Sequence, residues 1–232
     1  MKPMTDIVKF ELVKKYLERH PNEVRQNAIV IDVGGIPQYF HLLESLFRPA
    51  LVFVLNLEID MKSVPSILAT ANHLPFKDET CNVITSFDVL EHLLQPEKFV
   101  SEASRVLQAD GLFVLATPNL ADIYSRVTFL FGYTPFHYDP SPCRGGLTKT
   151  KETKRGHKSV FTYGAVRELL KYYRFEIVES YGYPYIEPFY HEAGLKDVQR
   201  EVGFNRLRRA LGHVLPPSLS EGMILFCKKN RG

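Results

Sequence analysis

The stretch that decides the fold reads Ala28-Ile29-Val30-Ile31-Asp32-Val33-Gly34-Gly35. A short, continuous apolar run that ends in an acid and two glycines is typical of a strand buried on both faces of a sheet and followed by a tight turn. In open α/β sheets, ligands bind beyond the carboxyl ends of such strands, where glycines let backbone N–H groups come close. Asp32 suits a ligand that carries an ammonium group near the turn, or else it caps the next helix.

Strands and helices alternate on both sides of this stretch. The predicted strands are 28–31, 50–55, 66–71, 81–86, 112–116, 176–180 and 222–227, and the predicted helices that follow the first strand are 39–47, 97–107 and 161–173. Strands that alternate with helices predict crossover connections and a mostly parallel sheet with both faces covered. We therefore expect an α/β fold in a single domain, 1–232.

Three further segments surround this core. Over residues 5–20 the apolar side chains recur every three or four positions, with Lys9, Lys14, Lys15 and Glu18 between them, which predicts an amphipathic helix. From Ser141 to Arg174 there are nine Lys or Arg against two Glu, so we expect a basic insertion or lid at about 120–160. Leu195 to Leu215 predicts a basic amphipathic helix.

The composition excludes several classes of protein. Hydrophobic residues make up 45% and charged residues 24%, as in ordinary globular domains, and the net charge of +3 gives no field that implies nucleic-acid binding. The three cysteines form no C-x-x-C pair, which argues against a disulfide framework and for a reducing compartment. No apolar run reaches the ~18 residues of a membrane span, and residues 1–10 are unlike a signal peptide. We expect a cytoplasmic protein.

Four short motifs follow in a fixed order after the glycine turn. They are Leu74-Pro75-Phe76, Leu90-Glu91-His92, Arg105-Val106-Leu107 and Thr117-Pro118-Asn119. In this order and spacing the chain resembles the class I S-adenosylmethionine-dependent methyltransferases, most strongly over about 28–119 and again near 156–178 and 223–228. The resemblance implies a Rossmann-like, doubly wound sheet with an antiparallel last strand, helices on both faces, and S-adenosyl-L-methionine as cofactor.

The resemblance also implies which residues bind the cofactor. They are Asp32, Gly34, Gly35, Asn56, Glu58, Thr70, Ala71, Phe87 and Asp88. The glycine turn would lie under the methionine end, Phe87 and Asp88 would border the methionine tail and the transferred methyl, and Thr70 and Ala71 would meet the adenine. For the ribose both Asn56 and Glu58 are candidates, and Glu58 is preferred because a carboxylate accepts hydrogen bonds from both hydroxyls.

The glycine loop departs from the family's pattern. Ile36 and Gln38 stand where the family has its second and third glycines, unless the loop is one residue shorter. In a shorter loop Gly35 fills the critical position and Ile36 points into the interface between helix and sheet. We expect this second arrangement, because the motifs around the loop are intact.

The sequence therefore predicts a methyltransferase that acts on a small-molecule or carrier-bound acceptor. His92 is a candidate general base, since the pKa of histidine lies near neutrality, but a structural role under the site is the preferred interpretation. The basic residues near 149–158 make an anionic acceptor one option. His137 and His157 lack metal-ligand spacing, so no metal site is predicted. The alternative function is a catalytically impaired, methyltransferase-like binding or scaffold domain; an NAD-binding oxidoreductase lacks its glycine fingerprint.

Overall fold

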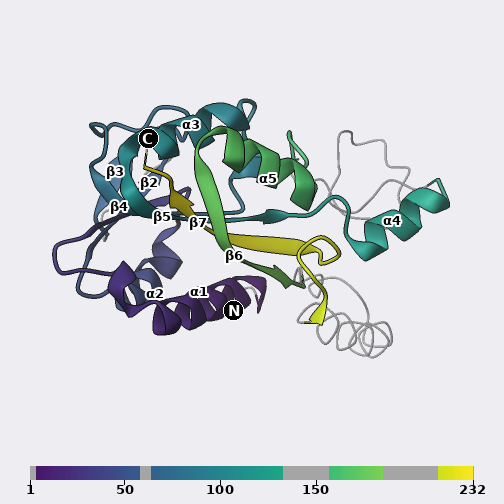
Figure 1. The fold of residues 1–232 in the computed structure, drawn as a ribbon, viewed down its shortest axis with the longest axis horizontal. Coiled ribbons are helices and arrows are strands. Elements are labelled where there is room, and N and C mark those ends of the chain that lie inside the picture. The colour runs from purple at the N-terminus through teal and green to yellow at the C-terminus, as the bar shows by residue number, and fades with distance from the viewer. Residues whose placement is uncertain (1–3, 58–63, 133–156, 185–213, 232) are drawn as a thin grey trace.

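The computed structural model describes residues 4–57, 64–132, 157–184 and 214–231 (Figure 1). Their strands form one seven-stranded sheet in the order β3-β2-β1-β4-β5-β7-β6. The strands are β1 (Ile29–Val33), β2 (Leu51–Asn56), β3 (Ser66–Leu68), β4 (Cys81–Phe87), β5 (Leu107–Pro118), β6 (Phe175–Tyr183) and β7 (Gly222–Lys229). All neighbours are parallel except that β7 is antiparallel to both β5 and β6. The predicted α/β sheet and its antiparallel last strand are confirmed.

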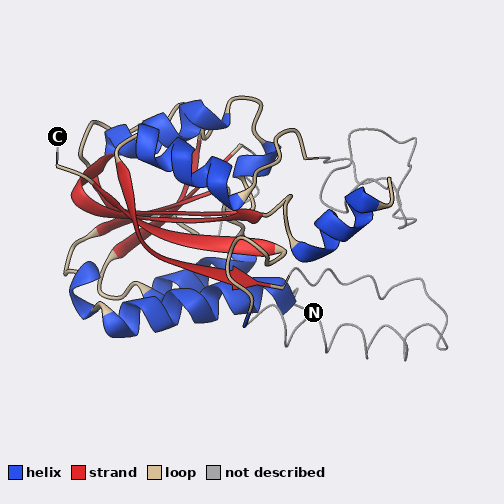
Figure 2. Cartoon of the chain, turned by 45° about the vertical axis from the view of Figure 1, so that its right-hand side comes forward, coloured by secondary structure: helices blue, strands red, loops and turns tan. Residues whose placement is uncertain are grey.

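Helices cover both faces of the sheet (Figure 2). The described helices are α1 (Met4–Arg19), η1 (Pro21–Glu23), α2 (Pro37–Leu46), η2 (Leu90–His92), α3 (Pro96–Val106), α4 (Ile123–Leu130) and α5 (Tyr163–Tyr172). Apolar side chains of α1 and α2 pack on one face, and those of α3 and α5 pack on the other. The two layers make the fold doubly wound.

The central strands are mostly apolar because both of their faces are covered. In β1, Val30 belongs to the core under α1 and α2, whereas Ile31 belongs to the core under α3 and α5. Both side chains are fully buried. Successive side chains of a strand point to opposite faces, so a strand between two helical layers is mostly apolar on both faces.

Helix α1 brings an unexpected polar side chain into the core. Val13 and Tyr16 are buried, and the Tyr16 ring stacks on Phe226 with the ring centroids 4.2 Å apart. Lys9 lies four residues before Val13, on the same stripe of the helix, and only 1% of its surface is exposed. The polar residues between the apolar positions of this helix therefore do not all face solvent.

Arg105 and Glu102 explain two of the sequence motifs structurally. The Arg105 guanidinium donates to the carbonyl oxygens of Leu74 and Phe76, at 3.0 and 2.8 Å, and to Glu102 Oε1 at 2.7 Å. Glu102 Oε2 accepts a hydrogen bond from the Leu74 amide at 2.9 Å. This network on α3 fixes the turn that precedes β4, and Arg supplies it because its planar fork presents several donors at once.

Several expectations fall outside the described residues. These are the ribose candidate Glu58, residues 133–156 of the expected lid, Cys143 and most of the predicted helix 195–215. The single domain remains a prediction. None of the helices in the described part of the chain is long and apolar enough to cross a membrane.

Candidate active site

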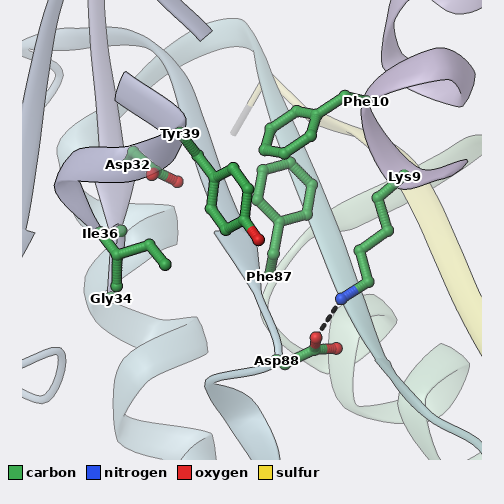
Figure 3. A pocket seen from close by; sticks show the side chains of 9 residues that line it. Lys9, Phe10, Asp32, Gly34, Ile36, Tyr39, Phe87 and Asp88 are labelled. Carbon is green, nitrogen blue, oxygen red and sulfur yellow. Dashed lines mark hydrogen bonds and ion pairs between the residues drawn. The ribbon is translucent and has the colours of Figure 1, made fainter. Parts of the chain in front are cut away.

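A cavity of about 220 Å³ lies where β1 and β4 end, beside α1 (Figure 3). Its lining residues come from α1, the turn after β1, the start of α2 and the end of β4. They are Lys9, Phe10, Asp32, Gly34, Gly35, Ile36, Tyr39, Phe87 and Asp88. The structure thus brings five of the residues predicted for the cofactor to one cavity: Asp32, Gly34, Gly35, Phe87 and Asp88.

The turn after β1 requires glycine at both positions. Gly34 has a φ of +79°, and a Cβ atom added there would lie 2.2 Å from Val89 Cγ2. A Cβ atom added at Gly35 would lie 2.0 Å from Asp32 Oδ2. Since real Cβ contacts are far longer, a side chain at either position would push the turn away from β4 or displace the Asp32 carboxyl.

Asn56 braces this turn from the end of β2. Its side-chain amide donates to the Gly35 carbonyl oxygen at 2.9 Å, and its Oδ1 accepts from the Leu57 amide at 2.7 Å. Asn56 does not line the cavity. Its observed contacts support the shape of the loop, and its predicted contact with a ribose stays a prediction.

The two residues predicted to meet the adenine lie away from this cavity. Thr70 is exposed and forms an isolated bridge with His73, while Ala71 is buried in the core under α3 and α5. Neither lines the cavity. Their contact with an adenine ring also stays a prediction.

Ile36 overturns the expectation that it points into the interface between helix and sheet. It lines the cavity and is 40% exposed. Its backbone is extended, with a φ of −121°, because α2 begins only at Pro37. The buried face of α2 is made by residues further along, such as Phe40 and Leu43, so Ile36 lies ahead of the first helical turn.

Asp32 is the most deeply placed acid of the cavity. It is 3% exposed, and the Thr85 hydroxyl on β4 donates to its Oδ1 at 2.7 Å. Burial raises the pKa of Asp32 to about 7, and the hydrogen bond from Thr85 opposes this rise. The carboxyl therefore changes its charge near neutral pH, within reach of a ligand in the cavity.

Lys9 and Asp88 form an ion pair across the cavity, drawn as a dashed line in Figure 3. The Asp88 side chain is 23% exposed and also accepts from the Tyr183 hydroxyl at 3.5 Å. Asp88 has a φ of +53°, and its amide donates to the Ala116 carbonyl oxygen at 3.0 Å. Lys9 is not among the site residues predicted from the sequence, although its four-residue spacing to Val13 places it on the buried stripe of α1.

Three aromatic rings make the apolar wall of the cavity. Phe10 lies edge-on to Phe87 with the centroids 5.5 Å apart, and its ring centroid is 5.3 Å from that of Tyr39. Rings in such contacts stabilise each other beyond the area they bury. The wall joins α1, α2 and β4 on the side of the sheet where Asp32 lies (Figure 3).

Glu91 and His92 lie on η2, just beyond the cavity lining. Glu91 is 2% exposed, and the Thr117 hydroxyl donates to its Oε2 at 3.0 Å. Burial, and then the negative charge of Asp88, raise the pKa of Glu91 to about 8. His92 lies beside His157, with the ring centroids 5.0 Å apart, and does not line the cavity. Its role as a general base stays a prediction.

Comparison with known proteins places this geometry in context. Residues 49–115 match a family model described as a methyltransferase domain. A probable S-adenosylmethionine-dependent methyltransferase of Mycolicibacterium smegmatis is 31% identical over 134 residues, which is 56% of this chain and 40% of that protein. The chain thus spans less than half the length of this curated relative.

Solved structures share the fold at low sequence identity. An S-adenosylmethionine-dependent methyltransferase from Archaeoglobus fulgidus aligns with a TM-score of 0.57 at 18% identity, over 95% of this chain and 94% of its own. The 1,6-didemethyltoxoflavin-N1-methyltransferase of Burkholderia thailandensis, solved with its substrate and S-adenosylhomocysteine, aligns with a TM-score of 0.55 at 14% identity, over 96% and 79% of the two chains.

The ion pair across the cavity predicts a measurable stability effect. Lys9→Met keeps the apolar stem but leaves Asp88 without its counter-charge, so the free energy of unfolding in urea should fall by about 2–3 kcal/mol. Adding Asp88→Asn to this variant should recover part of the loss. Lys14→Met, at a lysine whose side chain is 65% exposed, should change the value by less than about 0.5 kcal/mol. Equal effects of the two lysine variants would contradict the assignment.

Proposed function

We propose that the chain is a class I S-adenosylmethionine-dependent methyltransferase, which transfers a methyl group from S-adenosyl-L-methionine to an acceptor. The match of residues 49–115 to a methyltransferase domain and the similarity to a probable S-adenosylmethionine-dependent methyltransferase support this. The methionine end of the cofactor would occupy the cavity beside α1. The acceptor would be a small molecule or a carrier-bound group, and the reaction would take place in the cytoplasm.

One observation carries this proposal: a buried acid stands beside two obligatory glycines at the point where the sheet order reverses. Strands β2 and β4 flank β1; the connection from β1 leads to β2 on one side, and the connection from β4 leads to β5 on the other. Ligands of open α/β sheets bind at such a switch point. Asp32 would face the ammonium group of the methionine moiety. Because Gly34 and Gly35 have no side chains, the carboxylate of the methionine moiety could come close to the backbone of the turn.

Methyl transfer from a positively charged sulfur depends more on the alignment of the reacting atoms than on acid–base catalysis. When bound, the cofactor would supply a methyl group on a positively charged sulfur. The acceptor atom would bond to the methyl carbon in line with the breaking C–S bond, and the electrons of that bond would pass to the sulfur. Holding the nucleophile, the carbon and the sulfur in line supplies most of the rate enhancement. The wall of Phe10, Tyr39 and Phe87 would keep water away from the reacting centre.

The class of acceptor is inferred from charge. The basic residues near 149–158 favour an anionic acceptor, such as a phosphate- or carboxylate-bearing group, because a local excess of positive charge raises the concentration of anions nearby. Of these residues, Lys158 lies in the described part of the chain and is exposed. No nucleic-acid partner follows from the overall charge of +3.

Titration with S-adenosylhomocysteine tests the proposal directly. Calorimetry should show one binding site per chain, and Gly34→Ala should weaken binding by at least about tenfold, because its methyl group would collide with Val89 at the cavity. Gly132 also has a positive φ, +75°, but a Cβ added there meets nothing within 4 Å. Gly132→Ala is therefore the matched control and should bind normally. Absence of binding to the unmodified chain would favour the scaffold alternative.

Cofactor affinity should depend on pH through Asp32. Because the pKa of Asp32 is raised to about 7, the carboxyl is mostly neutral at pH 6 and mostly ionised at pH 8. The ammonium group of the ligand prefers the ionised form, so the affinity for S-adenosylhomocysteine should fall about tenfold from pH 8 to pH 6. Asp32→Asn should bind more weakly at pH 8 and show a flatter profile. A slope that survives in Asp32→Asn would assign the proton to another group.

Ile36 gives a third test, since it lines the cavity at a position where the family has glycine. Ile36→Gly should tighten binding of S-adenosylhomocysteine about three- to tenfold, and the flexibility of glycine should cost only about 0.5–1 kcal/mol of stability. Leu94→Gly, at an exposed leucine outside the cavity, is the matched control and should leave the affinity unchanged. Weaker binding by Ile36→Gly would mean that Ile36 contacts the ligand favourably.

A further inference from the structure

Glu91, His92 and His157 form a cluster next to the proposed site of methyl transfer. Each offers one ligand atom, a carboxylate oxygen or an imidazole nitrogen, and the three atoms all lie within 4.8 Å of one another. The first two residues belong to η2, and His157 lies in the segment that leads to α5. The cluster is separate from the lining of the cavity.

Backbone hydrogen bonds hold the two parts of the cluster together. The Glu91 carbonyl oxygen accepts from the amides of Lys158 and Ser159, at 2.8 and 3.0 Å. The Ser159 hydroxyl donates to the Leu93 carbonyl oxygen at 2.9 Å. His157 is therefore tied to the turn that carries Glu91 and His92. Preorganised ligands of this kind lose little conformational entropy when they bind an ion.

A second, independent observation concerns the oxygens of the Glu91 carboxylate. The side chain is 2% exposed, and its Oε2 is held by the Thr117 hydroxyl. Its Oε1 is buried and has no hydrogen-bond partner among the described residues. An oxygen of this kind is costly to bury unless something satisfies it, and an ion bound between it and the two imidazoles would do so.

We propose that Glu91, His92 and His157 bind a divalent transition-metal cation of the zinc type. One carboxylate and two imidazoles suit Zn²⁺ and its first-row neighbours, whereas Mg²⁺ and Ca²⁺ prefer oxygen ligands alone. Thr117 would then orient the ligating carboxylate, as outer hydrogen bonds commonly do at metal sites. Three protein ligands leave a further position for a water molecule or a ligand oxygen. The proposal does not depend on cofactor binding or on methyl transfer.

The size of the cluster is compatible with such an ion. Bonds of about 2.0–2.1 Å to zinc bring ligand atoms roughly 3–3.5 Å apart in a tetrahedral site, somewhat closer than the limit of 4.8 Å that the three atoms satisfy. His92 and His157 are only partly buried. Rotation of their imidazole rings toward Glu91 would close the site around the ion.

Metal titration of the full chain tests this site without any cofactor. The chain, free of a histidine tag and stripped with a chelator, is titrated with Zn²⁺ by calorimetry and with Co²⁺ by visible absorption. We expect one tightly bound ion per chain and absorption bands typical of low-coordinate cobalt. Glu91→Gln and His157→Asn should each weaken Zn²⁺ binding by at least about tenfold, since each removes a ligand or its charge.

A surface histidine provides the matched control. His41 Nδ1 lies 3.5 Å from Glu44 Oε2, and the His41 side chain is 79% exposed. This pair therefore places an imidazole beside a carboxylate outside the cluster. His41→Asn should bind Zn²⁺ as the unmodified chain does. If the buried Glu91→Gln variant fails to fold by circular dichroism, the more exposed His157→Asn variant decides. Absence of a tight site, or equal binding by His157→Asn and His41→Asn, would overturn the proposal.

Discussion

Strands β1 and β4 pair in the parallel register that sets Asp32 opposite Thr85. This register places the Thr85 hydroxyl within 2.7 Å of the carboxyl that burial would otherwise leave unsatisfied. It also brings the glycine turn after β1 beside Val89, which follows β4 and leaves no space for a Cβ at Gly34. A shift by one residue would turn every side chain of β1 to the opposite face and would dissolve both contacts together.

The acids at this edge of the sheet are each stabilised by a different partner. Asp32 has the Thr85 hydroxyl, Asp88 has the Lys9 ammonium, and Glu91 has the Thr117 hydroxyl. A hydroxyl donates a hydrogen bond to a carboxylate without neutralising its charge. The Lys9 ammonium, by contrast, carries a charge opposite to that of Asp88. Burial accordingly raises the pKa values of Asp32 and Glu91, the two acids that are held by hydroxyl groups.

Much of the fold could be predicted from the sequence because short apolar runs mark the central strands. A run such as Ala28 to Ile31 is apolar at every position, which only a strand covered on both faces requires. The glycine turn of Gly34 and Gly35 follows from the local pattern, whereas Phe87 and Asp88 were predicted from the resemblance to a known family; parallel strands bring all four to one edge. These positions depend on local pattern and on topology, both of which the order of residues records.

The remaining features depend on contacts between distant segments. Lys9 is buried because α1 lies against β4 and β6, where Asp88 and Tyr183 meet it, and no rule of composition places a lysine in a core. Ile36 lines the cavity because it precedes the first turn of α2, and the direction of a loop side chain depends on how the loop packs, which the sequence pattern does not record. His157 lies beside Glu91 because the amides of the next two residues, Lys158 and Ser159, donate to the Glu91 carbonyl oxygen. Spacing along the chain does not reveal this cluster, since Glu91 and His92 belong to one motif but His157 lies far from it in the sequence.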